Sequence, residues 1–214
     1  MIIEQSSASD NLFPMILTLI TGDDNEKMDP IERFDPFNDR LCRNVRNALC
    51  EAFKLAIEEN DLHPVDDVAQ AFMNETLPAC VSDYIEHRIA AYDAVLAELD
   101  ANAVSDPLDV ALVIWDRRLF FETHEYLEPY WLAAGGDDKR LLQALIRFAG
   151  TYVHLEQGNL TAAERISVKA IDGLSRFKDR LALYADPQRL LDKLKTLDPV
   201  PPKLSGTAKT SPEG

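Results

Sequence analysis

Apolar residues recur every three or four positions in each long segment of this 214-residue chain, which is the spacing of an amphipathic helix. No segment alternates apolar and polar residues for long enough to predict a β-strand. The chain has only 8 glycines, which argues against the turn-rich connections of a β architecture. We therefore predict an all-α fold, a multihelical array of antiparallel helical hairpins with an N-terminal three-helix extension.

Prolines and glycines divide the chain into predicted helices. In the N-terminal half, we expect one helix at about 38–59 and two more that begin at Pro64 and Pro78. In the C-terminal half, Asp106-Pro107 and Asp186-Pro187 are typical of helix N-termini, because the carboxylate caps free N–H groups and proline fits the first turn. The helices predicted there span about 107–117, 119–133, 138–157, 161–177 and 187–197.

These helices define five segments of the chain. We predict a weakly structured N-terminal segment (1–34), an N-terminal helical region (35–100), a helical domain (106–178), a C-terminal helix (179–197) and a disordered tail (198–214). The tail is rich in proline, lysine, serine, threonine and glycine, a composition that buries too little apolar surface to fold by itself.

The net charge and the cysteines indicate which partners this protein can bind and in which cellular compartment it is located. A net charge of −15 repels phosphate backbones and anionic lipids, so we expect neither nucleic-acid nor membrane binding. The 3 cysteines lack CxxC spacing, which favours free thiols and a cytoplasmic location over a disulfide framework or a zinc ribbon. The expected partner is a protein, either another copy of this chain, as in a homodimer, or a different one.

One predicted helix, 119–133, carries ionisable residues on its apolar side. On a helical wheel, His124 and Glu128 fall in the middle of an arc of about 140° that is otherwise apolar. The remaining members of this arc are Phe120, Phe121, Leu127, Trp131 and Leu132. The wheel places Glu122, Thr123, Tyr126 and Tyr130 on the opposite side of the helix.

The next predicted helix is apolar almost all round, and its polar residues Gln143, Arg147 and His154 share one face. If the two helices pack antiparallel through the short loop at Gly135-Gly136, these residues face His124 and Glu128. Buried polar groups cost roughly 2–7 kcal/mol each when unpaired, so we expect a hydrogen-bonded network that joins the two helices.

Three interpretations of this network stay open. It is a polar core that fixes how the helices dock, a pocket for a small molecule or ion, or a metalloenzyme site with zinc or iron held by His124, Glu128 and His154. In the third case Glu125 is a candidate general base, because His124-Glu125-x-x-Glu128 partly matches the HExxH pattern of zinc proteases. The full set of candidate site residues is His124, Glu125, Glu128, Trp131, Gln143, Arg147 and His154.

A family resemblance rests on the same segment. Phe121-Glu122-x-His124-Glu125-x-Leu127-Glu128-x-x-Trp131, followed by Gln143, Leu145, Ile146 and Gly158-Asn159, resembles the family known as domain of unknown function 309. The resemblance covers about residues 106–178 and implies a compact helical domain, with no established activity. Ala144 and Arg147 depart from the glycine and glutamine that are usual in that family.

Function is the least constrained property. No nucleophile motif or glycine-rich phosphate loop is present in the sequence, which removes the enzyme classes built on them. We predict a non-enzymatic docking or scaffold module without a cofactor. The alternative is a small-molecule or metal-binding site, hydrolytic in its catalytic form, built from His124, Glu128 and His154.

Overall fold

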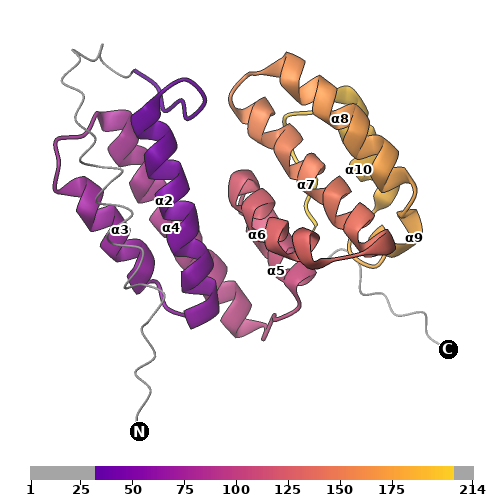
Figure 1. Ribbon diagram of the computed structural model, residues 1–214, viewed down its shortest axis with the longest axis horizontal. Helices are drawn as coiled ribbons and strands as arrows, with labels where there is room; N and C mark the ends of the chain where they lie inside the picture. The colour runs from indigo at the N-terminus through magenta and orange to yellow at the C-terminus, as the bar shows by residue number, and fades with distance from the viewer. Residues whose placement is uncertain (1–31, 205–214) are drawn as a thin grey trace, which may run out of the picture. The chain divides into compact units, whose positions relative to one another are not determined.

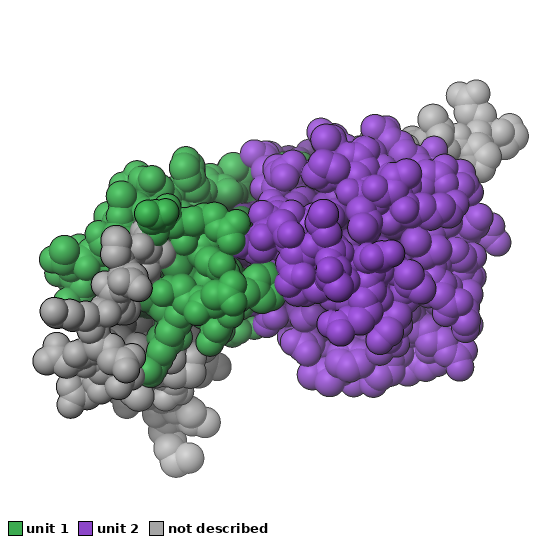
Figure 2. Space-filling model, turned by 90° about the horizontal axis from the view of Figure 1, so that it is seen from above, with its two compact units in different colours: residues 1–100 green, residues 101–214 purple. Residues whose placement is uncertain are grey.

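The computed structural model describes residues 32–204, and within this range every regular element is a helix (Figure 1). The helices are α2 (Arg40–Glu59), α3 (His63–Met73), α4 (Ala79–Ala101), α5 (Pro107–Asp116), α6 (Phe120–Ala133), α7 (Gly136–Glu156), α8 (Leu160–Ser175), α9 (Lys178–Leu181) and α10 (Pro187–Thr196). The all-α prediction is confirmed. None of these helices is both long enough and apolar enough to cross a membrane. The chain forms two compact units, residues 1–100 and 101–214 (Figure 2).

Aspartate caps begin two helices of the second unit at the positions expected from the sequence. The Asp106 carboxylate accepts a hydrogen bond from the Leu108 N–H at 2.9 Å at the start of α5. Asp186 accepts from Gln188 at 2.9 Å at the start of α10. Each cap satisfies N–H groups that have no partner inside the helix, so each fixes a helix start.

The first unit packs α2, α3 and α4 around aromatic side chains. Phe53 of α2 stacks on Tyr92 of α4 with ring centroids 4.0 Å apart. Burial raises the pKa of the Cys42 thiol, near the start of α2, to about 12, so this free cysteine stays protonated. Of the segment 1–34, residues 1–31 lie outside the described residues, and Phe34 stacks on Tyr84 of α4.

The second unit is built around Trp115 of α5. Its ring lies 4.6 Å from that of Phe120 in α6, 4.2 Å from that of Phe148 in α7 and 5.0 Å from that of Tyr152 in α7. All four aromatic side chains are at least 98% buried. Stacked and edge-on rings of this kind hold three successive helices together through one apolar cluster.

Helices α6, α7 and α8 form the predicted run of hairpins, since α7 packs against both α6 and α8 and short loops join them. The approach of α7 to α8 is close because small residues meet there. A Cβ added at Gly173 of α8 would lie 2.6 Å from the Cβ of Ala144 in α7, well inside van der Waals contact. Glycine is therefore required at position 173 by packing.

The prediction of a disordered tail from residue 198 is wrong for residues 198–204. Pro202 and Leu204 are buried, and the indole N–H of Trp115 donates to the Pro202 carbonyl oxygen at 2.8 Å. The composition of this segment predicts disorder because the segment cannot form a core by itself. In the structure it is ordered because its buried residues complete the core formed by α5, α6 and α7. Residues 205–214 of the predicted tail lie outside the described residues.

The close contact at Gly173 predicts that Gly173→Ala destabilises the protein. The added methyl group overpacks the α7–α8 interface, at a cost of about 1–3 kcal/mol that exceeds the gain of up to about 1 kcal/mol in helix propensity. Gly150→Ala in α7 is the matched control, because its Cβ would meet nothing closer than 4.0 Å. Urea denaturation should show a lower free energy of unfolding for the first variant and an equal or higher one for the second. Equal values for the two variants would contradict this account.

Candidate functional site

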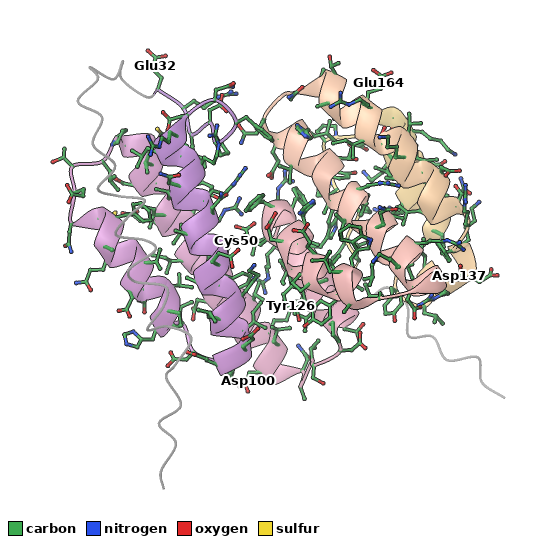
Figure 3. The ribbon with its side chains drawn as sticks, in the orientation of Figure 1. Glu32, Cys50, Asp100, Tyr126, Asp137 and Glu164 are labelled. Carbon is green, nitrogen blue, oxygen red and sulfur yellow. The ribbon has the colours of Figure 1, made fainter. Side chains whose placement is uncertain are left out.

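Helix α6 is rotated relative to the orientation expected from its apolar pattern. Its buried side carries Glu122 and Thr123, which are 1% and 4% exposed, together with Phe120, Tyr126 (Figure 3) and Leu127. His124 and Glu128 are half-buried at the border of this face. The prediction that His124 and Glu128 lie in the centre of the buried stripe, with Glu122, Thr123 and Tyr126 opposite, is therefore wrong.

The physical reason is that apolar residues lie on more than one side of α6, with polar residues between them, so the sequence does not single out one face. The predicted apolar arc was centred near His124 because it included Trp131 and Leu132. Leu132, however, is 63% exposed in the structure. The face that enters the core is the one that meets Trp115 and Phe148, through Thr123 and Leu127.

His124, Glu125 and Glu128 nevertheless form a cluster. One potential ligand atom from each residue lies within 4.8 Å of the other two. The Nδ1 atom of His124 is 3.1 Å from the Oε1 atom of Glu125, and the two side chains are 32% and 25% exposed. Glu128 forms no hydrogen bond or ion pair with any described residue, so its carboxylate is available to a ligand.

The helix itself brings these three residues together. Positions 124 and 128 are one turn apart, so their side chains lie on the same side of α6, and Glu125 is next to them around the helix. On its other side the His124 ring borders Gly150 of α7, where a Cβ would lie 4.0 Å from the imidazole Cδ2 and 4.0 Å from Ile166 of α8. The neighbouring helices therefore cover one edge of the imidazole.

The other predicted site residues lie outside this cluster. Gln143, Arg147 and His154 are half-buried on α7, and His154 is not part of the ligand group. Among the residues with described positions, His124 hydrogen-bonds to Glu125, its neighbour in the chain, and the expected bonds from His124 to Gln143 or Arg147 do not form. The predicted network across the two helices is therefore wrong at its central link.

Trp131 lies one turn beyond Glu128. It is half-buried, and the Nζ atom of Lys139 is 5.2 Å from its ring centroid. Its indole N–H is enclosed and has no hydrogen-bond partner within residues 32–204. Trp131 therefore forms a cation–π contact at the end of α6 and does not join the cluster.

His154 has its own electrostatic environment near the end of α7. Burial lowers the pKa of its imidazole from 6.5, and the positive charge of Arg165 in α8 lowers it further. Protonation of His154 is thus disfavoured in the folded state.

Two features of this region were not predicted from the sequence. Glu122 was assigned to the polar side, but its carboxyl group is buried. Tyr152 carries a buried hydroxyl without a hydrogen-bond partner among the described residues, and burial raises its pKa. Only the repeated apolar positions around Tyr152 gave a signal for its burial. Nothing in the local pattern distinguished Glu122 from an exposed glutamate.

Comparisons with known proteins agree with the resemblance seen in the sequence. Residues 108–166 match the family model described as Domain of unknown function (DUF309). This range covers α5 from its second residue, all of α6 and α7 with the cluster, and the start of α8. The predicted family resemblance is confirmed over this part of the chain. No curated protein and no solved structure gave a significant match.

The environment of His154 predicts a specific pH dependence. Because its folded-state pKa lies below 6.5, the unfolded chain binds this proton at higher pH, and the free energy of unfolding falls as pH is lowered through 6.5. Arg165→Gln should raise the His154 pKa measured by NMR titration, and Arg140→Gln at an exposed site on α7 should not. An unchanged His154 titration in Arg165→Gln would contradict the assignment.

Proposed function

We propose that the protein binds a divalent transition-metal ion through His124, Glu125 and Glu128 on α6. The observation that carries this proposal is the convergence of one imidazole and two carboxylates to within 4.8 Å. Ligand atoms about 2.0–2.2 Å from a metal ion lie roughly 3–4 Å from one another. Small side-chain rotations are therefore enough to close the cluster around an ion.

The types of ligand narrow the choice of metal. An imidazole with two carboxylates suits zinc, iron(II) or manganese(II) better than calcium, which prefers six or more oxygen ligands. Three protein ligands leave at least one coordination position for water or a small molecule. The partial burial of His124 and Glu125 lowers the local dielectric, which strengthens the attraction of the carboxylates for a cation.

This metal set differs from the one predicted from the sequence. Glu125 takes the place of His154, because Glu125 follows His124 directly on the same helix, whereas His154 belongs to α7. The proposal concerns metal binding, and it assigns no reaction to the protein.

Metal binding is tested by calorimetric titration of the full chain with Zn²⁺ and with Mn²⁺. We expect one ion per chain, and a rise in the free energy of unfolding of about 2.7 kcal/mol at a free ion concentration of 100 times Kd. His124→Ala should weaken binding by at least about tenfold, since it removes the only nitrogen ligand. The control is His63→Ala, because His63 pairs with Asp67 on an exposed helix face without a third ligand. Equal binding by both variants would overturn the proposal.

A second candidate function is docking to another copy of the chain. Tyr130 and Leu132, near the end of α6, are 39% and 63% exposed. Aromatic residues such as tyrosine are enriched in protein contact surfaces, and a neighbouring exposed leucine can add apolar area to such a contact.

Self-association is tested by sedimentation at increasing protein concentration. We expect the wild-type chain to form dimers, and Leu132→Asp to shift it toward the monomer because a charge would be buried in the contact. Val168→Asp is the control, since Val168 on α8 is also 63% exposed. A wild-type chain that stays monomeric throughout would remove this candidate.

A further inference from the structure

Residues 198–204, here named the C-terminal strap, run as an extended segment over the second unit after α10 ends. Two hydrogen bonds join the strap to the end of α5. The indole Nε1 of Trp115 donates to the Pro202 carbonyl oxygen at 2.8 Å, and the Leu204 N–H donates to the Asp116 carboxylate at 2.7 Å. Both contacts link residues more than 80 positions apart in the chain.

Only the end of the strap is buried. Pro202 and Leu204 are buried, whereas Val200 and Lys203 are exposed. Leu204 enters an apolar groove whose wall is formed mainly by Leu108, Leu112, Trp115, Leu127, Leu145 and Phe148. A void of about 10 Å³ remains beside Leu204, so the groove is not filled as tightly as the core around it.

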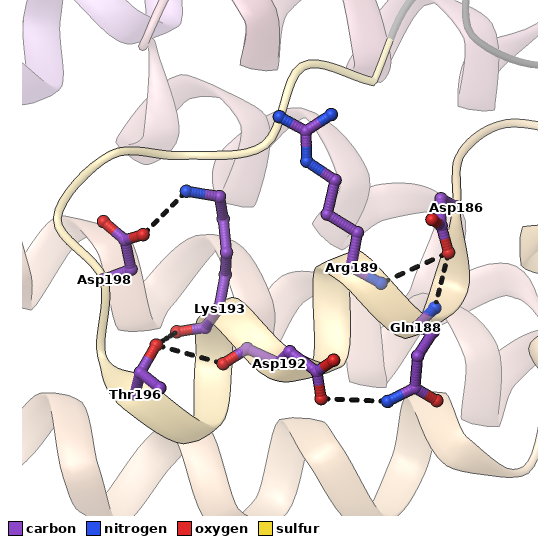
Figure 4. A pocket seen from close by; sticks show the side chains of 7 residues that line it. All are labelled: Asp186, Gln188, Arg189, Asp192, Lys193, Thr196 and Asp198. Atoms are coloured by element: carbon purple, nitrogen blue, oxygen red, sulfur yellow. Dashed lines mark hydrogen bonds and ion pairs between the residues drawn. The ribbon is translucent and has the colours of Figure 1, made fainter.

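The beginning of the strap is held by α10. The Nζ atom of Lys193 is 2.8 Å from the Asp198 carboxylate (Figure 4). The same atom donates to the Val200 carbonyl oxygen at 2.7 Å. The Lys193 side chain is only 17% exposed, so these contacts are partly shielded from water. The strap is thus anchored at two places, at Lys193 and in the groove.

The contacts of the strap resemble those that a bound peptide makes. The strap has no regular secondary structure, and three of its seven residues are proline. It is held by one hydrogen bond that its backbone accepts, one that its backbone donates, and one buried leucine side chain. Proline-rich segments lose little conformational entropy on binding, and aromatic grooves with an indole N–H recognise them in other systems.

We propose that the groove of α5, α6 and α7 is a binding site for an extended proline-rich peptide, and that the strap is its ligand in cis. In the bound peptide, one carbonyl oxygen accepts a hydrogen bond from the Trp115 indole N–H. Two residues later, a leucine donates its backbone N–H to the Asp116 carboxylate and places its side chain in the apolar groove. A peptide with the sequence of residues 198–204 therefore binds in trans when the chain's own strap has been released.

The test uses the full chain with Leu204→Asp, which places a charge where the groove is apolar and so releases the strap. The probe is a fluorescein-labelled peptide of residues 198–204, and binding is followed by anisotropy. We expect saturable one-to-one binding to Leu204→Asp that is at least about tenfold tighter than to the wild-type chain, whose strap competes. The control protein is Leu183→Asp, at a leucine that is 66% exposed in the same unit.

A second peptide carrying the same aspartate in place of leucine separates groove binding from nonspecific binding. It should bind none of these proteins. Equal affinity of the two peptides, equal binding to wild-type and variant chains, or no binding to a variant that keeps its helical circular dichroism would each overturn the proposal.

Limited trypsin digestion gives an independent measure if Leu204→Asp does not fold. Lys193→Ala removes one anchor of the strap without changing the groove, whereas Lys195→Ala removes a neighbouring exposed lysine that pairs with Asp192. Cleavage between Lys203 and Leu204 should be roughly tenfold faster in Lys193→Ala than in Lys195→Ala. Equal rates would show that the strap is not a separately releasable ligand, and would contradict the proposal.

Discussion

The burial of Trp115 is the interaction on which the second unit depends. An indole contributes a large apolar surface, but its N–H has to be satisfied once it leaves water. Phe120, Phe148 and Tyr152 surround the ring, and the carbonyl oxygen of Pro202 accepts the N–H. One side chain therefore couples α5, α6 and α7 to a segment that follows α10.

This coupling also determines where the cluster on α6 lies. Thr123 and Leu127 face the same apolar groove as Trp115, which leaves the residue after Thr123 at the edge of the buried face. That residue is His124, which lies at this border beside Gly150. A half-buried position suits a carboxylate-rich cluster, because full burial would impose a large desolvation penalty on Glu125 and Glu128.

The sequence predicted the helices far better than it predicted their faces. Asp106-Pro107, Asp186-Pro187 and the glycines near 135 and 158 act locally, through caps and backbone freedom, so they locate helix ends without knowledge of the fold. The buried side of α6 depends on its neighbours, since Phe121 and Leu132 are as apolar as the residues that enter the core. The strap was missed for a related reason: its composition describes a segment in isolation, whereas Pro202 and Leu204 are ordered by contacts with α5.

The cluster and the groove use different faces of α6 and depend on structure in different ways. His124, Glu125 and Glu128 belong to a single helix, so their convergence requires little beyond helix formation and the room left at Gly150. The groove requires three helices and the Trp115 ring to be in place, so it forms only when the unit is folded. Loss of the strap would therefore leave the three residues of the cluster together, and a change at His124 would leave the groove intact. The two proposed sites can therefore be disrupted independently. The residues of the cluster all belong to α6, whereas the groove is lined by residues of three helices.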